Sequence, residues 1–300
     1  MKRIVAIVGA LAFVAAACSS SPSVVATVGG TEITRPDVEG LVRDDGNDIV
    51  PADFLRYLGV AIQWEAVEQA AASDFGIDPT DTEVDDRVSQ LVTEYSPDAT
   101  LEEYLESANA SQGGIELYAR QLLIQAALEE ALADRYEAPT DADVDNEITE
   151  FPLDWTEVCA SHILVATRQE AEAALKRYND GEDFAALATE LSSDSSAANG
   201  GDLGCQSAAR YVGEFAESAM NAEIGVPTEP VETQFGFHVL LVRERNTAEK
   251  DLVRDYLEAR AKAAVVNEWF EAAVAAATVT VDDSVGVWVL EPSPQVLPNA

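Results

Sequence analysis

The spacing of apolar residues predicts a largely helical segment between residues 34 and 150. Apolar positions recur there every three or four residues, as they do on one face of an amphipathic helix. A short β-rich run at 24–28 precedes this segment and ends at a double glycine. Threonines placed before proline or glutamate mark predicted helix starts, because such residues cap the first turn. These starts are Thr34 before Pro36, Thr80 before Glu83 and Thr100 before Glu103.

Residues 157–245 change to a mixture of strand and helix patterns. The run 157–166 (EVCASHILVA) predicts a strand, and the later run 237–244 (FHVLLVRE) predicts a closing strand. Between them the sequence predicts a helix from Thr167 to about residue 180, a second at 184–191, a Gly/Ser-rich turn at 192–204 and a short helix at 215–220. A long helix to about residue 277, a β-like TVTVD run and a Pro-rich tail follow.

The first residues have the pattern of an export signal. Two basic residues precede an apolar, uncharged run at 4–17, which is shorter than the roughly 20 residues that span a bilayer. The run ends in Ala-Ala-Ala-Cys, with the cysteine at position 18. This ending resembles a bacterial lipobox and predicts lipidation of Cys18, with cleavage at an Ala-x-Ala site as the alternative. We therefore expect an extracytoplasmic protein, anchored to the cell membrane by lipid through a Ser/Pro tether at 19–23.

The charge of the chain restricts its partners. Fifty-five acidic residues against 18 basic ones give a formal net charge of −37. Such a charge argues against binding to nucleic acid or to anionic membranes through the protein surface. Hydrophobic residues make up 47% of the chain, so disorder throughout is excluded.

Chemistry that requires imidazole is confined to one region, because the chain has only two histidines, His162 and His238. Each lies in one of the two predicted strands of residues 157–245. Three motifs around them, ASHILV, DFAALATELSSDSSAANGGDLG and PVETQFGFHVLLV, resemble the parvulin family of peptidyl-prolyl cis-trans isomerases in order and spacing.

This resemblance implies a set of site residues. The two histidines face each other at the catalytic centre, Asp194 points at the substrate, and Thr233 completes the polar network. The substrate-binding positions implied by the resemblance are Tyr211, Val212, Phe215 and Phe235. Phe235 stands where some relatives have serine, and Gln206 where an aromatic residue is usual. The resemblance implies neither a metal nor a cofactor.

Non-covalent catalysis fits these residue types. Rotation about an X-Pro bond is opposed by amide resonance, with a barrier of about 18–20 kcal/mol. An apolar slot removes water from the amide, and nearby polar groups stabilise its twisted form. An aspartate in place of a cysteine near the substrate argues against a covalent thiol mechanism.

The flanking segments resemble SurA/PrsA-type extracytoplasmic foldases, through VVATVGGTEITRPDV near the start and the helices on either side of residues 157–245. The expected fold is α+β, with a parvulin-like domain between or following an all-α chaperone module. The expected parts are a lipoprotein signal at 1–18, a helical chaperone region at 19–156 and a parvulin domain at 157–245. A C-terminal helix and tail at 246–300 are expected to pack on the N-terminal region.

These observations favour an isomerase and chaperone acting on unfolded or nascent exported polypeptides that contain X-Pro bonds. Two alternatives remain open. In the first, a degenerate parvulin domain only binds peptide, as a non-catalytic holdase, and Phe235 and Gln206 are the features that favour it. The second is a non-enzymatic surface-binding lipoprotein, which leaves the three motifs unexplained.

With Cys18 assigned to lipid, two cysteines remain. An even pair in an exported protein predicts a disulfide. If the parvulin arrangement holds, the loop that ends at Cys205 passes beside the strand that carries Cys159, so a bond between them is expected. The alternative is two buried free cysteines that behave as small apolar residues.

Overall fold

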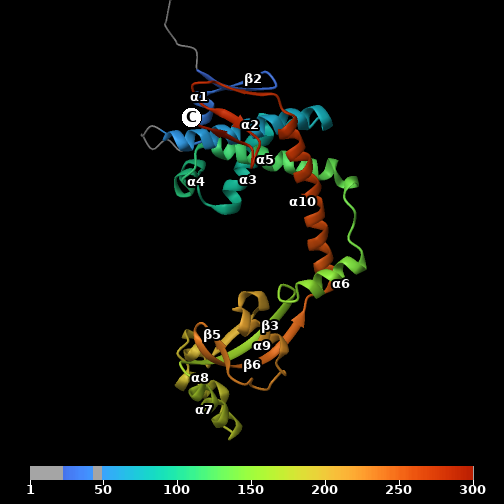
Figure 1. Cartoon of the computed structure of the whole chain (residues 1–300). Coiled ribbons are helices and arrows are strands. Elements are labelled where there is room, and N and C mark those ends of the chain that lie inside the picture. Colours follow the sequence, from blue (N-terminus) through green and yellow to red (C-terminus); the bar gives the residue numbers. More distant parts are fainter. Residues whose placement is uncertain (1–22, 43–48, 300) are drawn as a thin grey trace, which may run out of the picture. The chain divides into compact units, whose positions relative to one another are not determined.

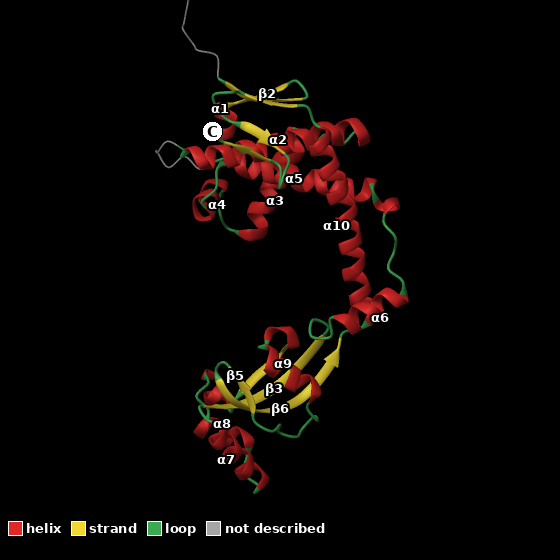
Figure 2. Ribbon diagram, viewed as in Figure 1, coloured by secondary structure: helices red, strands yellow, loops and turns green. Residues whose placement is uncertain are grey.

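The computed structural model describes residues 23–42 and 49–299, which fall into two compact units (Figure 1). One unit comprises Met1–Arg135 and Ala264–Ala300, and the other Tyr136–Ala263. The predicted signal and Cys18 lie outside the described residues. Helices and sheets occur together, which confirms the predicted α+β class (Figure 2). Within the described ranges, no helix is long and apolar enough to cross a membrane.

The first unit is mainly helical. Capping boxes at Thr80 and Thr100 are present as predicted, and Thr34 caps the first helix ahead of Pro36. Its helices are α1 (Arg35–Glu39), α2 (Pro51–Phe75), α3 (Asp81–Tyr95), α4 (Leu101–Ala108), α5 (Gln112–Ala131), the 3-10 turn η1 (Ala133–Arg135) and the part of α10 (Lys250–Ala276) that begins at Ala264.

Two small sheets accompany these helices. The strands β1 (Val24–Val28), β2 (Thr31–Thr34) and β7 (Val279–Val281) form an antiparallel sheet in the order β2-β1-β7. Strands β8 (Val287–Val289) and β9 (Gln295–Leu297) pair with each other. The sequence pattern indicates β1 and also the three-residue β7, which lies in the run TVTVD, whereas it does not indicate β2, β8 and β9.

The second unit is built on a four-stranded antiparallel sheet in the order β4-β3-β6-β5. Its strands are β3 (Thr156–Val165), β4 (Asp202–Ser207), β5 (Val231–Thr233) and β6 (Gly236–Thr247). Its helical elements are α6 (Asp141–Glu150), α7 (Arg168–Asn179), α8 (Phe184–Leu191), η2 (Ser195–Asn199), η3 (Ala208–Arg210), α9 (Gly213–Asn221) and the first part of α10.

Side chains on β3 and β6 alternate between two cores, because successive residues of a strand point to opposite faces. Val158, Ala160, Leu240 and Val242 pack with α9 on one face. Ile163, Val165, Val239 and Leu241 pack with α7 and α8 on the other. His162 and His238 follow the first alternation and so lie on the α9 face.

Strand β4 differs from the prediction, because it begins inside the expected turn at 192–204. Its sequence, DLGCQS, has the glycine and aspartate of a turn rather than the β-branched residues of a strand. It is an edge strand held by pairing to β3 and interrupted by a bulge. Its strand conformation therefore depends on its neighbour more than on its own sequence.

Candidate active site

The two histidines lie side by side on neighbouring central strands. Residue pairing places His162 opposite Leu240 and Leu164 opposite His238, so the two rings are offset by one diagonal step of the sheet. The rings are nearly parallel at a centroid distance of 5.3 Å, and their Nδ1 atoms are 3.1 Å apart. Both residues are buried, at 5% and 3% exposure. The predicted proximity of His162 and His238 is therefore seen in the structure.

Thr233 and Asp194 extend this pair at its two ends. Thr233 Oγ1, on β5, lies 2.8 Å from His238 Nε2 and accepts a hydrogen bond from the Phe235 N–H at 3.1 Å. Asp194 Oδ1 lies 3.2 Å from His162 Nε2, which has no hydrogen bond of good geometry in the described structure. The carboxylate therefore faces the ring at ion-pair distance.

With both rings neutral, one arrangement of protons suits all of these contacts. A carboxylate only accepts, so the tautomer of His162 that suits the nearby Asp194 has its proton on Nε2 and accepts at Nδ1. The proton between the rings then belongs to His238 Nδ1, and His238 Nε2 accepts from the Thr233 hydroxyl. The result is a polar chain of four side chains, Thr233, His238, His162 and Asp194. In this polar chain each group donates its proton toward the next, and the last acceptor is the carboxylate of Asp194.

The position of Asp194 is fixed by its own loop. Its side chain caps η2 by accepting the Ser196 N–H at 2.8 Å, and it remains 31% exposed. Burial acts to raise the pKa of Asp194, but the hydrogen bonds with Ser196 and the neighbouring His162 outweigh it and lower the pKa to about 2. Asp194 is therefore a carboxylate at neutral pH, partly open to solvent.

Backbone contacts hold the Asp194 loop against β3. The Gly201 carbonyl accepts the His162 N–H at 2.9 Å, and Gly201 has φ +75°. A Cβ there would lie 2.2 Å from the His162 carbonyl oxygen, so only glycine fits. Ser192 Oγ accepts the Leu164 N–H, and the Ser193 N–H donates to the Leu164 carbonyl. The role of Ser192 and Ser193 could not be predicted from the sequence, in which their only signal is their place just before Asp194.

An aromatic group lies against the histidines. The Phe215 ring, on α9, is 5.7 Å from the His162 ring and 5.5 Å from the His238 ring, edge-on to both. Tyr211 stacks on Phe215 at 4.6 Å. Phe215 is only 3% exposed, whereas Tyr211 and Val212 are partly exposed. Phe215 therefore lies behind Tyr211 in the apolar part of the site.

Two other predicted positions lie at the edges of the site. Phe235 is in the turn between β5 and β6 and is 63% exposed. Gln206 is on β4, opposite Val158 of β3. Burial raises the pKa of Tyr211, while the interaction of its side chain with Gln206 acts in the opposite direction.

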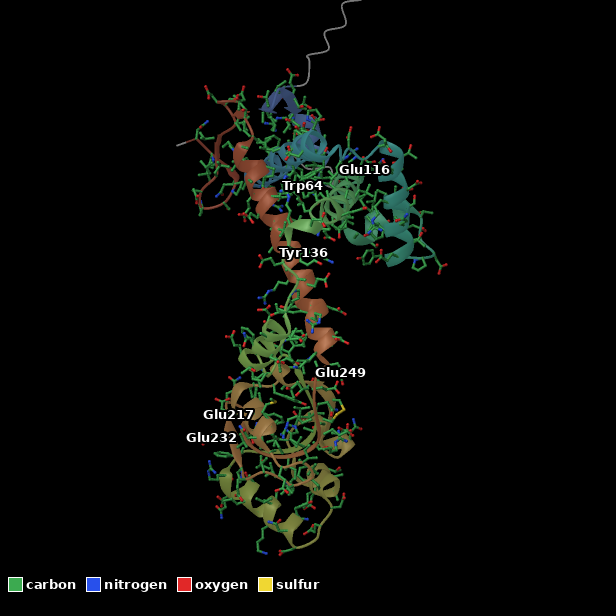
Figure 3. The ribbon with its side chains drawn as sticks, turned by 90° about the vertical axis from the view of Figure 1, so that its right-hand side faces the viewer. Trp64, Glu116, Tyr136, Glu217, Glu232 and Glu249 are labelled. Carbon is green, nitrogen blue, oxygen red and sulfur yellow. A yellow bond between two sulfur atoms is a disulfide. The ribbon has the colours of Figure 1, made fainter. Side chains whose placement is uncertain are left out.

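The predicted disulfide between Cys159 and Cys205 is present, and these residues are direct partners of β3 and β4 (Figure 3). Within the part of the chain that the structure describes, the group of side chains with metal-binding spacing is Glu157 with these two cysteines. Because the two sulfurs are bonded to each other, neither is a thiolate ligand.

The unfolding free energy should fall as the pH drops from 6.5 toward 4. Burial and repulsion from His162 lower the pKa of His238 from 6.5 to about 4, so the unfolded chain binds this proton first. The free energy that the neutral His238 ring contributes to folding is fully present above pH 6.5. It decreases as the pH falls and is lost at about pH 4. Urea titrations at several pH values measure the unfolding free energy. Because the chain has two histidines, their nitrogen NMR signals report the protonation of His238 directly. The same pH slope in His238→Gln would contradict the assignment.

The fold and this site define a parvulin-type domain. Residues 153–246 match the family model described as a PPIC-type PPIASE domain. A Foldase protein PrsA from Halalkalibacterium halodurans is 32% identical over 264 residues, which cover 78% of this chain and 78% of that protein. A second, from Exiguobacterium sibiricum, is 29% identical over 272 residues, covering 89% and 84%. The chain belongs to the PrsA foldase family.

A crystal structure of a peptidylprolyl isomerase (PrsA) from Bacillus anthracis is also similar. It is 21% identical, and the match covers 72% of this chain and 96% of that one with a TM-score of 0.39.

Proposed function

We propose that this protein is a peptidyl-prolyl cis-trans isomerase and chaperone that acts on unfolded exported polypeptides outside the cytoplasmic membrane. The observation that carries the proposal is the polar chain from Thr233 through the two histidines to Asp194, beside the aromatic pair of Tyr211 and Phe215. The names of the relatives, Foldase protein PrsA, support the same activity.

The catalytic role of Asp194 follows from amide resonance. In the planar amide, resonance places negative charge on the carbonyl oxygen, and twisting returns that charge to the nitrogen. A fixed carboxylate near this oxygen disfavours the planar form more than the twisted form, which lowers the barrier. The lowered pKa keeps Asp194 charged, and His162 holds its orientation. No covalent bond forms or breaks in this mechanism.

The proline ring would contact the exposed side of the aromatic pair. Tyr211 and Val212 are partly exposed and would touch the ring, while Phe215 supports them from beneath. The desolvated surface strengthens the effect of the nearby carboxylate.

Export and anchoring complete the proposal. The signal-like run at 4–17 and Cys18 support export with lipid attachment to the membrane. The disulfide supports an oxidising, extracytoplasmic location, since disulfides persist there and are rare in the cytosol. The partners would be polypeptides with X-Pro bonds that have not yet folded.

Asp194→Asn should lower kcat/KM for isomerisation of an X-Pro peptide by about 10- to 100-fold, the value of one charge-assisted interaction. Asparagine also caps helices, so it should keep the bond to the Ser196 N–H and leave peptide affinity nearly unchanged. A protease-coupled assay measures turnover, and peptide titration measures affinity.

Asp183→Asn is the matched control, because Asp183 caps α8 in the same way through the Ala186 N–H. It should leave turnover unchanged. A loss of affinity without a loss of kcat in Asp194→Asn would make Asp194 a substrate-positioning residue instead.

Two observations favour the alternative of a non-catalytic holdase. Gln206 occupies a position where the resemblance implies an aromatic residue, and Phe215 is almost fully covered by its own neighbours. Peptide binding by the wild-type protein without any acceleration of isomerisation would select the holdase and reject the isomerase.

A further inference from the structure

The Cys159–Cys205 disulfide lies at an exposed end of the second unit's sheet. Val158, the neighbour of Cys159 on β3, packs with α9, so the Cys159 side chain belongs to the opposite face of the sheet. On that face α7 and α8 pack farther along β3, at Ile163 and Val165. Cys205, on edge strand β4, is exposed, so solvent and small solutes reach its sulfur.

Two carboxylates lie on the same face as the disulfide. Glu157 precedes Cys159 by two residues on β3, and a carboxylate oxygen of Glu157 and the two sulfurs all lie within 4.8 Å of one another. Glu244, on β6, is the direct partner of Cys159 on the side away from Cys205. Both glutamates are exposed, and neither forms an ion pair with a basic side chain among the described residues. This end of the sheet therefore has negative charge that no neighbouring cation neutralises.

We propose that reduction of this disulfide creates a zinc site formed by Cys159, Cys205 and Glu157. Zn²⁺ binds cysteine thiolates and carboxylates in tetrahedral sites, and water supplies the fourth ligand here. The two sulfurs favour zinc over magnesium and calcium, which take oxygen ligands. The oxidised protein offers no thiolate, so the site exists only in the reduced protein. The proposal does not depend on isomerase activity.

Two chemical steps open and fill the site. A dithiol transfers two electrons and two protons to the S–S bond, which breaks to give two cysteine thiols, while the dithiol closes to its own disulfide. Zn²⁺ then binds both sulfurs as thiolates, and the two thiol protons pass to water. The charges of Glu157 and Glu244 disfavour free thiolates but attract the dication. The thiols therefore stay protonated until the metal binds.

The bound metal takes the place of the covalent link between β3 and β4. Cys159 and Cys205 are directly paired, so an ion bound to both sulfurs joins the same two strands. In the unfolded chain these cysteines are 46 residues apart in sequence, so the folded chain binds the ion more tightly and is stabilised by it. Zinc thus keeps the segment that contains Asp194 attached to β3 when the disulfide is reduced.

The test uses the full chain, reduced with a dithiol that is removed under nitrogen before metal is added. Co²⁺ serves as the optical probe, because thiolate ligands give it a charge-transfer band that carboxylates alone do not. We expect one Co²⁺ per reduced chain, displaced by Zn²⁺, and no such band in the oxidised chain. Zn²⁺ should raise the urea midpoint of the reduced protein. Glu157→Gln should raise the Kd for Zn²⁺ at least about tenfold, since changes even outside the ligand set cost that much.

Glu217→Gln is the matched control, because Glu217 is an exposed glutamate of the same unit on α9, on the opposite face of the sheet (Figure 3). It should keep the wild-type Kd, and Cys159→Ala/Cys205→Ala should show no charge-transfer band. Absence of the band in the reduced wild type overturns the zinc site. Equal Kd values for Glu157→Gln and the wild type also overturn it, because they show two thiols that bind metal without Glu157. An unchanged urea midpoint overturns the replacement of the disulfide by the metal.

Discussion

Phe215→Ala should lower the unfolding free energy of the second unit by about 3–5 kcal/mol, the cost of removing a buried aromatic ring. Phe215 is 3% exposed and supports three other rings, those of His162, His238 and Tyr211. Its removal leaves a cavity under the histidine pair, so the pair should also lose its fixed geometry. Urea denaturation measures the first effect, and the two histidine NMR signals report the second.

Phe184→Ala separates these two effects. Phe184 is 5% exposed, lies on α8 and packs in the core on the opposite face of the sheet. We expect a similar loss of stability with unchanged histidine signals and unchanged kcat per folded molecule. If Phe215→Ala destabilises the protein without altering the histidine signals, the ring fills space and does not position the pair.

The helices could be predicted where their signals are local. The capping boxes at Thr80, Thr100 and Thr167 join residues three apart, so sequence alone contains both partners. The short strands could not be predicted in this way. Strand β4 is determined by its pairing with β3 more than 40 residues earlier, and that pairing cannot be read from DLGCQS.

Two similar segments also show that local signals can be read from the sequence, whereas contacts between distant residues cannot. Residues 79–85 (PTDTEVD) and 139–145 (PTDADVD) are similar in sequence, and both begin helices with a capping box at the threonine. In the structure each start is also held by an arginine. Arg120 donates to the Pro79 carbonyl and contacts Asp81, and Arg254 does the same for Pro139 and Asp141.

The second partner of each such contact comes from a helix far along the chain. Arg120 lies 41 residues after Pro79, and Arg254 lies 115 residues after Pro139. The local similarity therefore predicted the caps, whereas the arginine contacts required the fold.

In the candidate site, too, some features could be predicted from the sequence and others depend on the fold. Because the chain of 300 residues has only two histidines, few residues could supply an imidazole to the site. The motif resemblance placed these histidines together with Asp194 and Thr233. The sequence could not show that Phe215 is covered by Tyr211, because stacking depends on how α9 and η3 pack. Nor could it show that Ser192 and Ser193 attach the loop to Leu164, since serines in a Gly/Ser-rich turn are usually solvated.

Removing the Cys159–Cys205 disulfide should lower the unfolding free energy by about 4 kcal/mol, the chain-entropy value for this loop. The two cysteines are 46 residues apart in sequence. The bond connects edge strand β4 to β3, three residues before His162, at a place where the pairing of β3 is interrupted by bulges. It therefore closes the segment that contains Asp194 onto the strand that contains its partner.

A loss of kcat should accompany the loss of stability. Without the bond, the Asp194 loop is held to β3 by the hydrogen bond from His162 to Gly201 and by the contacts of Leu164 with Ser192 and Ser193. Cys205 is exposed, so a dithiol reductant can reach the bond. Urea denaturation and X-Pro turnover are measured for the wild type with and without reductant, and for the Cys159→Ala/Cys205→Ala variant. Reductant should move the wild type to the values of the variant and leave the variant unchanged. Equal stability of oxidised and reduced wild type would show that the pairing of β3 with β4 holds the loop without the disulfide.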